Sequence, residues 1–305
     1  SHKGLNTTFS PFCLQSIHVF WFNTYINVKE QTMKFALKSL LVASLTLTST
    51  MALSHNHESS LSHAIQSSER SAKNSARDEY RHPEQTLAFF GFKPTMTVVE
   101  IAPGGGWYSE ILAPALKEQG LYYAAHFPSD SSVGYYQRSL AGFKKKVAED
   151  ERFSKVKISE FAPLTHTDIA PAGTADMVLT FRNVHNWYMG KDTKGALSAF
   201  KSFYKALKPG GVLGVVEHRL DESRPDEDQK STGYMKQSYV VDLAKKAGFE
   251  LVASSEINAN PKDTADHPKG VWTLPPSLRL GEQDADKYKA IGESDRMTLK
   301  FKKPL

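Results

Sequence analysis

One stretch of the sequence constrains the fold more than any other: a β-branched run that ends in three glycines. Residues 95–102 (TMTVVEIA) are typical of a buried strand, and Pro103 and Gly104-Gly105-Gly106 end it. Glycine adopts backbone angles that other residues resist, and it lets a ligand approach the main chain closely. A plain tight turn has the same composition. In a doubly wound sheet, however, such a turn lies where a nucleoside binds across the strand ends.

Strand and helix patterns alternate after this turn. Further strands are predicted at 121–125, 155–159, 176–181, 212–217, 250–254 and 296–302, and helices at 109–119, 133–149, 193–207 and 235–247. Strands separated by helices predict a parallel sheet with right-handed crossovers. No helix clearly separates the last two strands, so we expect the final one to run antiparallel. The predicted fold is a doubly wound, Rossmann-like α/β sheet of seven strands.

Charge and cysteine content exclude several classes of function. The net charge is +5, but Lys3, Lys29, Lys34 and Lys38 outnumber the single acid in residues 1–54, and the rest is nearly balanced. A nucleic-acid interface would need a clustered basic face. Cys13 is the single cysteine, which excludes a disulfide framework, a thiolate nucleophile and a cysteine metal site in the rest of the sequence.

The start of the sequence has the layout of a secretory signal. We expect residues 1–32 to be a non-native upstream extension, with Met33 as the true first residue. Residues 33–54 then form a signal peptide: a basic start, an uncharged and partly apolar run, and small residues at 52–54. We therefore expect a periplasmic or secreted protein without a stable membrane anchor, or a cytoplasmic one if the signal is not cleaved. Residues 55–76 are predicted to be a linker or loose helix, and residues 77–305 the folded domain.

Two families share a glycine-rich turn of this kind. A dinucleotide-binding fold needs G-x-G-x-x-G and an acid about 20 residues later, whereas here Ser109 and His126 stand at those positions. Glu100 instead precedes the turn, and Lys208-Pro209-Gly210-Gly211 precedes the fifth strand. Together these features resemble the class I S-adenosylmethionine (SAM)-dependent methyltransferases, over roughly residues 78–305. The local sequence Phe181-Arg182-Asn183-Val184 is similar to the ubiquinone/menaquinone C-methyltransferases, and residues 181–187 and 258–261 resemble a group of exported predicted methyltransferases.

The resemblance implies SAM as cofactor and assigns residues to it. The turn would hold the methionine part, although Ala102 replaces the first glycine of the family motif. His126 stands where the family has an acid for the ribose, so Asp130 is the substitute candidate, and Glu160 with Phe161 would lie beside the adenine. The full set of expected cofactor residues is Glu100, Ala102, Gly104, Gly105, Gly106, Tyr108, His126, Asp130, Glu160, Phe161, Arg182 and Asn183.

The acceptor is expected beyond the fourth strand, where residues 182–187 combine a cation, two amides, an imidazole and an indole. Methyl transfer needs alignment of a nucleophile, and a general base where that nucleophile carries a proton. His185 is the first candidate base, because the pKa of an unperturbed imidazole lies near neutrality. Glu217 and His218, at the end of the fifth strand, are the other catalytic candidates. Each of these residues is equally compatible with a structural or surface role.

The remaining expectations concern a lid, metals and alternative functions. The long segment 257–294 is predicted to cover the acceptor pocket, because long loops in compact domains are often functional covers. No metal site is predicted, since His55 and His57 lack suitable partners. The first interpretation is methyl transfer to a small-molecule acceptor. A non-catalytic SAM- or nucleoside-binding exported protein and an NAD-dependent oxidoreductase remain alternatives.

Overall fold

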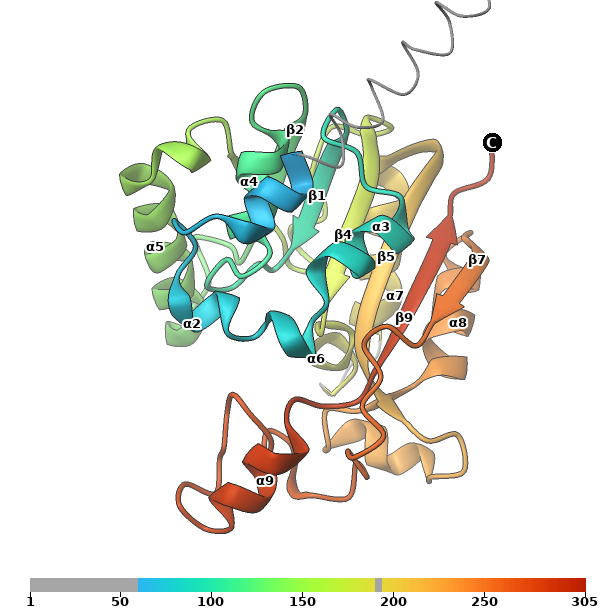
Figure 1. The fold of residues 1–305 in the computed structure, drawn as a ribbon. Helices are drawn as coiled ribbons and strands as arrows, with labels where there is room; N and C mark the ends of the chain where they lie inside the picture. The colour runs from blue at the N-terminus through green and yellow to red at the C-terminus, as the bar shows by residue number, and fades with distance from the viewer. Residues whose placement is uncertain (1–59, 190–193) are drawn as a thin grey trace, which may run out of the picture. The chain divides into compact units, whose positions relative to one another are not determined.

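The computed structural model describes residues 60–189 and 194–305 (Figure 1). The predicted upstream extension, the signal peptide and the first residues of the predicted linker lie outside this part. All of the described residues belong to one compact unit. Among the described residues, no helix is long and apolar enough to cross a membrane.

A mixed sheet forms the centre of the domain (Figure 1). Seven strands lie in the order β3-β2-β1-β4-β5-β9-β7, and the short strand β6 pairs with the end of β5. The strands are β1 (Thr97–Ile101), β2 (Leu121–His126), β3 (Lys157–Glu160), β4 (Ala175–Phe181), β5 (Leu207–Leu220), β6 (Met235–Lys236), β7 (Glu250–Ser255), β8 (Pro268–Val271) and β9 (Arg296–Lys302). The predicted Rossmann-like α/β fold is confirmed, with β6 as an additional strand.

The last strand runs antiparallel, as predicted. β9 lies between β5 and β7 and pairs antiparallel with both, with Val215 opposite Leu299 on one side and Ser254 opposite Leu299 on the other. The other main strands pair in parallel. The carboxyl ends of β1, β2, β4 and β5 therefore meet at one edge, where doubly wound folds bind their ligands.

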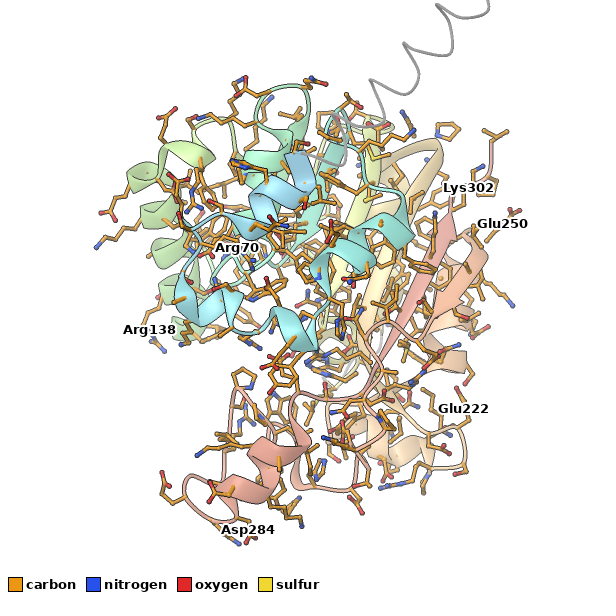
Figure 2. All side chains as sticks on the ribbon, in the orientation of Figure 1. Arg70, Arg138, Glu222, Glu250, Asp284 and Lys302 are labelled. Carbon is orange, nitrogen blue, oxygen red and sulfur yellow. The ribbon has the colours of Figure 1, made fainter. Side chains whose placement is uncertain are left out.

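Helices cover both faces of the sheet. They are α2 (Ala72–Ser75), α3 (Pro83–Phe90), α4 (Ser109–Leu116), α5 (Gly134–Glu149), α6 (Val184–Tyr188), α7 (Lys194–Ala206), α8 (Gln237–Lys246) and α9 (Ala285–Ile291), with 3-10 turns at Asp78–Tyr80, Glu151–Phe153 and Asp226–Lys230. Apolar residues of α7 and α8 pack on one face, and those of α3, α4 and α5 pack on the other. Side chains fill both layers (Figure 2).

The described part of the predicted linker belongs to the domain. Residues 60–66 are helical, and Leu61 and Ala64 are buried against the core. Arg70 pairs with Asp78 at 2.6 Å, and the indole of Trp107 donates to the carbonyl of Asn74. Apolar burial and these polar contacts fix the segment, so the domain begins before residue 77 (Figure 2).

Two segments that lacked clear patterns contain regular structure. The segment after β4 forms the short helix α6, and the long segment 257–294 contains β8 and α9. The latter, drawn in red, lies beyond the carboxyl ends of the parallel strands (Figure 1). The predicted turn at 208–211 lies within the bounds of β5, where it shifts the register with β4 between Ala175 and Met177.

Candidate active site

The glycine turn lies against an open cavity. Ala102 leaves β1 with φ 48°, and Gly104 and Gly106 have φ 58° and 81°. A Cβ added to Gly104 or Gly105 would meet nothing within 4 Å, whereas one on Gly106 would lie 3.2 Å from the Phe143 ring. Ala102, Gly104 and Gly105 line the cavity, and Gly106 packs behind it. Since positive φ in a residue other than glycine is uncommon, Ala102 marks a backbone held in an unusual shape.

Glu100 lies behind this turn and does not line the cavity, which differs from its expected contact with a cofactor. Its carboxyl group accepts hydrogen bonds from Ser109 Oγ at 2.9 Å and from the hydroxyl of Tyr122. Burial raises the pKa of Glu100 to about 7, although both hydrogen bonds oppose that shift. Glu100 therefore joins β1 to α4 and β2, because its side chain points beneath the turn.

Tyr108 is also buried behind the cavity wall, contrary to an expected cofactor contact. Its ring stacks on Phe181 with centroids 3.6 Å apart, and burial raises its pKa to about 12. Trp107, the preceding residue, faces the cavity. The helical turn at the start of α4 orients the two rings differently. Trp107 therefore lines the cavity, and Tyr108, the expected residue, does not.

His126 braces the glycine turn. The backbone N–H of Phe127 donates to His126 Nδ1 at 2.8 Å, so the other ring nitrogen carries the proton and donates to the carbonyl of Gly104 at 3.1 Å. Burial lowers the pKa of His126, which favours this neutral form. The imidazole thus stabilises the turn and does not line the cavity. The expected contact of His126 with a ribose is not available in this arrangement.

The other residues expected near the nucleoside divide into two groups. Asp130 and Phe161 line the cavity, together with Phe127. Glu160 does not line the cavity. Its carboxylate instead accepts a hydrogen bond from the backbone N–H of Ser129 at 3.1 Å. Hydrogen bonds with the side chain and then the backbone of Ser129 lower the pKa of Glu160. Glu160 therefore holds the loop that carries Asp130.

The cavity has a volume of about 1000 Å³ and reaches from the glycine turn to the end of β5. A volume of this size lies at the upper end of ordinary small-molecule sites. Arg182 and Asn183 line it as expected, and the amide of Asn183 donates to the carbonyl of Ile101 at 3.0 Å. Asn183 thereby ties the end of β4 to the end of β1.

Three arginines pair with one carboxylate in the wall of this cavity, and a fourth, Arg182, lies nearby. Arg77 Nε and Arg81 Nε contact Glu293 at 2.5 and 3.2 Å, and Arg296 pairs with the same group. Burial opposes ionisation of Glu293, but the arginines outweigh it and hold its pKa well below the usual range. Burial and the nearby Arg296 lower the pKa of Arg182 to about 10. The four arginines and Glu293 all line the cavity, so this part of its wall carries excess positive charge.

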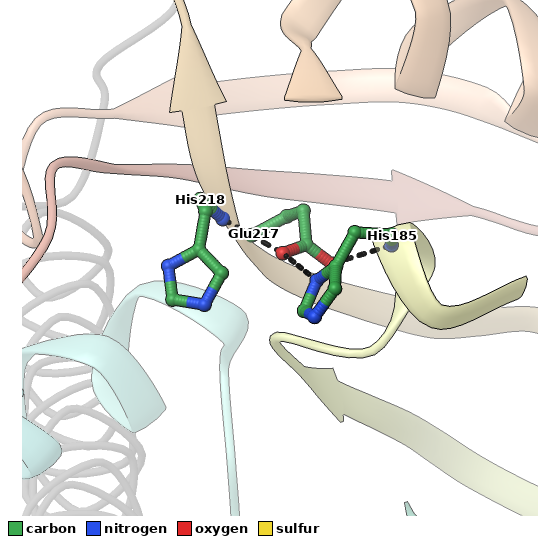
Figure 3. Close-up of side chains that lie close together, drawn as sticks. All are labelled: His185, Glu217 and His218. Carbon is green, nitrogen blue, oxygen red and sulfur yellow. Dashed lines mark hydrogen bonds and ion pairs between the residues drawn. The ribbon is translucent and has the colours of Figure 1, made fainter. Parts of the chain in front are cut away.

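The three predicted catalytic residues meet at the far end of the cavity (Figure 3). His185 Nδ1 lies 2.9 Å from Glu217 Oε1. Glu217 Oε2 accepts from the backbone N–H of Val184 at 2.6 Å, at the start of α6. Since a carboxylate only accepts, His185 donates from Nδ1, and Nε2 has the lone pair in the neutral imidazole. His185 and His218 line the cavity, and Glu217 lies behind them.

His218 is held as a neutral imidazole beside this pair. Its Nδ1 lies 2.6 Å from Ser294 Oγ, and its ring centroid lies 5.2 Å from that of His185. Burial lowers its pKa well below the usual value. Two imidazoles and one carboxylate from β5 and α6 therefore form a buried cluster. No pattern in the sequence predicts a metal site at these residues.

Aromatic residues close the cavity from two sides. Trp187, which supplies the indole of segment 182–187, packs edge-on against Phe161 and Phe203 at centroid distances of 5.5 and 5.6 Å. Trp272, from the long segment, lies nearer the catalytic candidates, with its ring centroid 6.0 Å from that of His185. Arg279 stacks over Trp272 at 4.5 Å, and both line the cavity. Residues of the long segment therefore form part of the cavity wall.

Comparison with known proteins adds information on the fold. No protein-family model matches the chain, and no curated protein sequence matches it significantly. Among solved structures, a proposed sarcosine dimethylglycine methyltransferase from Galdieria sulphuraria is similar, with a TM-score of 0.52, 12% identity, and coverage of 76% of this chain and 86% of that one. The [4+2]-cyclase SpnF is also similar, with a TM-score of 0.51 and 16% identity. The match covers 79% of this chain and 85% of SpnF.

The chain has the class I methyltransferase fold. At such low identity the likeness establishes the architecture alone. The choice of reaction must therefore be argued from the site.

Proposed function

We propose that this protein is a SAM-dependent methyltransferase that acts on a small-molecule acceptor. The observation that supports the proposal best is one continuous cavity, which joins the glycine turn after β1 to the paired His185 and Glu217 after β4 and β5. Such a cavity can hold a nucleoside cofactor at one end and an acceptor beside a proton acceptor at the other.

The residues along the cavity fit SAM. Gly104 and Gly105 leave open space beside the main chain for the methionine part. The excess charge of Arg77, Arg81, Arg182 and Arg296 over Glu293 suits a carboxylate, and Arg296 Nε is buried without a hydrogen-bond partner among the described residues. Phe127 and Phe161 offer apolar surfaces for the adenine ring, and Asp130 offers a carboxylate for the ribose.

The catalytic roles follow from the hydrogen bonds. When bound, SAM supplies an electrophilic methyl group on a sulfonium sulfur. Glu217 fixes the tautomer of His185, so that His185 Nε2 can accept the proton that the acceptor atom loses. The covering segment with Trp272 limits the access of water to the same space. His218, held by Ser294, lines the acceptor end beside His185.

Calorimetric titration of residues 55–305 with SAM, S-adenosylhomocysteine and NAD tests the proposal. We expect both sulfur nucleosides to bind and NAD not to bind. Binding of NAD without SAM would favour an oxidoreductase and contradict the proposal.

The base is tested with a His185→Ala variant once an acceptor is found. Loss of a general base commonly reduces the rate by about 10²- to 10⁴-fold. We expect kcat to fall in this range with SAM affinity nearly unchanged, because the contact acts mainly in the transition state. A parallel loss of SAM affinity would assign His185 a structural role. The exposed His63 gives the control, His63→Ala, with no expected effect.

A second function is favoured by one comparison. SpnF shares the fold and is described as a [4+2]-cyclase, so methyl transfer is not the only use of this architecture. SAM binding without methyl transfer to any component of a cell extract would support a binding protein or another reaction at the same site.

We also propose that the protein is exported, on the signal-like residues 33–54. N-terminal sequencing of the protein from its native host should begin near residue 53 or 55. A cytoplasmic product that retains Met33 would contradict export.

A further inference from the structure

The cluster of His185, Glu217 and His218 offers more than a proton acceptor. The three side chains place possible ligand atoms within 4.8 Å of one another, and all three are buried. They come from the end of β5 and from α6, whose first residue, Val184, donates its backbone N–H to Glu217. Neutral imidazole is the commonest side-chain ligand for transition metals.

Hydrogen bonds already fix the orientation that such ligands need. His185 Nδ1 is paired with Glu217, and His218 Nδ1 is paired with Ser294 Oγ. The free nitrogen of each ring is therefore Nε2, and both rings line the cavity. Metal-bound histidines commonly donate their other ring N–H to a carboxylate or another acceptor, which is the role that Glu217 and Ser294 have here. Figure 3 shows the two rings with Glu217 drawn between them and hydrogen-bonded to His185.

We propose that His185 and His218 bind one divalent first-row transition metal ion, with Glu217 as its charged supporting group. Two protein nitrogens leave coordination positions open toward the cavity. The proposal rests on the function proposed above and refines it: the acceptor is a molecule with oxygen or nitrogen donors that binds the ion. When bound, the ion would stabilise the deprotonated acceptor in place of His185, and the proton that the acceptor loses would pass to solvent.

The nearby charges and the type of ligand atom decide which ion the cluster can bind. Arg182 and Arg296 lie near the cluster and oppose a positive charge, and Glu217 supplies one negative charge in contact with His185. Mg²⁺ and Ca²⁺ prefer several oxygen ligands, whereas imidazole suits Zn²⁺, Cu²⁺, Ni²⁺ and Fe²⁺. We therefore expect the site to bind Zn²⁺ and to reject Mg²⁺ and Ca²⁺.

Metal binding is measured directly on the full chain. His55 and His57 are replaced by Ala in every protein tested, so that they contribute no ion binding. In this background, calorimetry with Zn²⁺ should give one equivalent per chain, and Mg²⁺ should give none. His185→Gln, His218→Gln and Glu217→Gln should each weaken Zn²⁺ binding at least tenfold. The control His63→Gln, at an exposed histidine, should leave it unchanged.

A second measurement needs no variant within the cluster. X-ray absorption of the Zn²⁺-loaded His55→Ala/His57→Ala chain should show two imidazole ligands. Absence of stoichiometric binding, or a site without imidazole, would overturn the metal proposal. Calorimetry with SAM separates the two proposals: SAM binding without Zn²⁺ binding removes only the metal, whereas Zn²⁺ binding without SAM binding removes the methyltransferase.

Discussion

Buried polar side chains in this protein hold the glycine turn in place through hydrogen bonds. Glu100 is an acid placed under a backbone turn, with Ser109 and Tyr122 as its donors. His126 donates to the carbonyl of Gly104 from the other side. At both positions the resemblance predicted a direct contact with the cofactor, and the structure shows support of the turn instead. A charged residue at a motif position can thus act on the ligand through the backbone.

The pKa of Glu100 makes a prediction for stability. Its value is about 7 in the folded protein against 4.5 for the unfolded group, so the native state binds more protons between these pH values. The free energy of unfolding must therefore fall as pH rises through this window, by about 3 kcal/mol for this group. Glu100→Gln removes the ionisation, so urea unfolding at pH 5 and pH 8 should show a smaller decline for the variant. Identical declines would show that Glu100 does not titrate in this range.

The elements that the sequence predicted well are those with strong local periodicity. β9 was predicted with its observed ends, and α7 and β4 within one residue. α6 was missed because its first turn is capped by Glu217 from another strand, a partner that no local pattern reveals. The glycine turn and the residues after β4 were found because strand ends in a parallel sheet meet at one edge. Parts of the long segment were missed because β8 and α9 are short.

The glycine turn makes a prediction at the scale of this element. Gly106 has φ 81°, and an added Cβ would lie close to Phe143 and Ser109. Gly106→Ala should therefore lower the free energy of unfolding by about 1 to 2 kcal/mol, the cost of a side chain in the left-handed region. Gly105→Ala is the matched control, because its Cβ would meet nothing and its φ is not in that region. Equal stability of the two variants in urea unfolding would contradict this account of the turn.

At the scale of the whole molecule, segments far apart in the sequence complete the site. Arg77 and Arg81 precede the sheet, whereas Glu293 and Arg296 lie at its last strand, more than 200 residues later. No local sequence pattern indicates a function for any of them. Their meeting depends on the path of the long covering segment, and neither spacing nor periodicity encodes such a path. The same contacts bring Ser294 to His218 and therefore connect the cover to the candidate catalytic cluster.

Removal of the carboxylate at the centre of this arrangement tests whether it holds the molecule together. Glu293 is buried and pairs with Arg77, Arg81 and Arg296, so Glu293→Gln leaves several buried cations without a counter-charge. Loss of one partner from a buried ion pair commonly costs about 3 to 5 kcal/mol. We expect urea unfolding to show a loss of this size. Glu227→Gln removes the exposed ion pair with Lys230 and should leave stability unchanged. If both variants match the wild type in stability, the arginines are held by their other contacts, and their charge serves ligand binding alone.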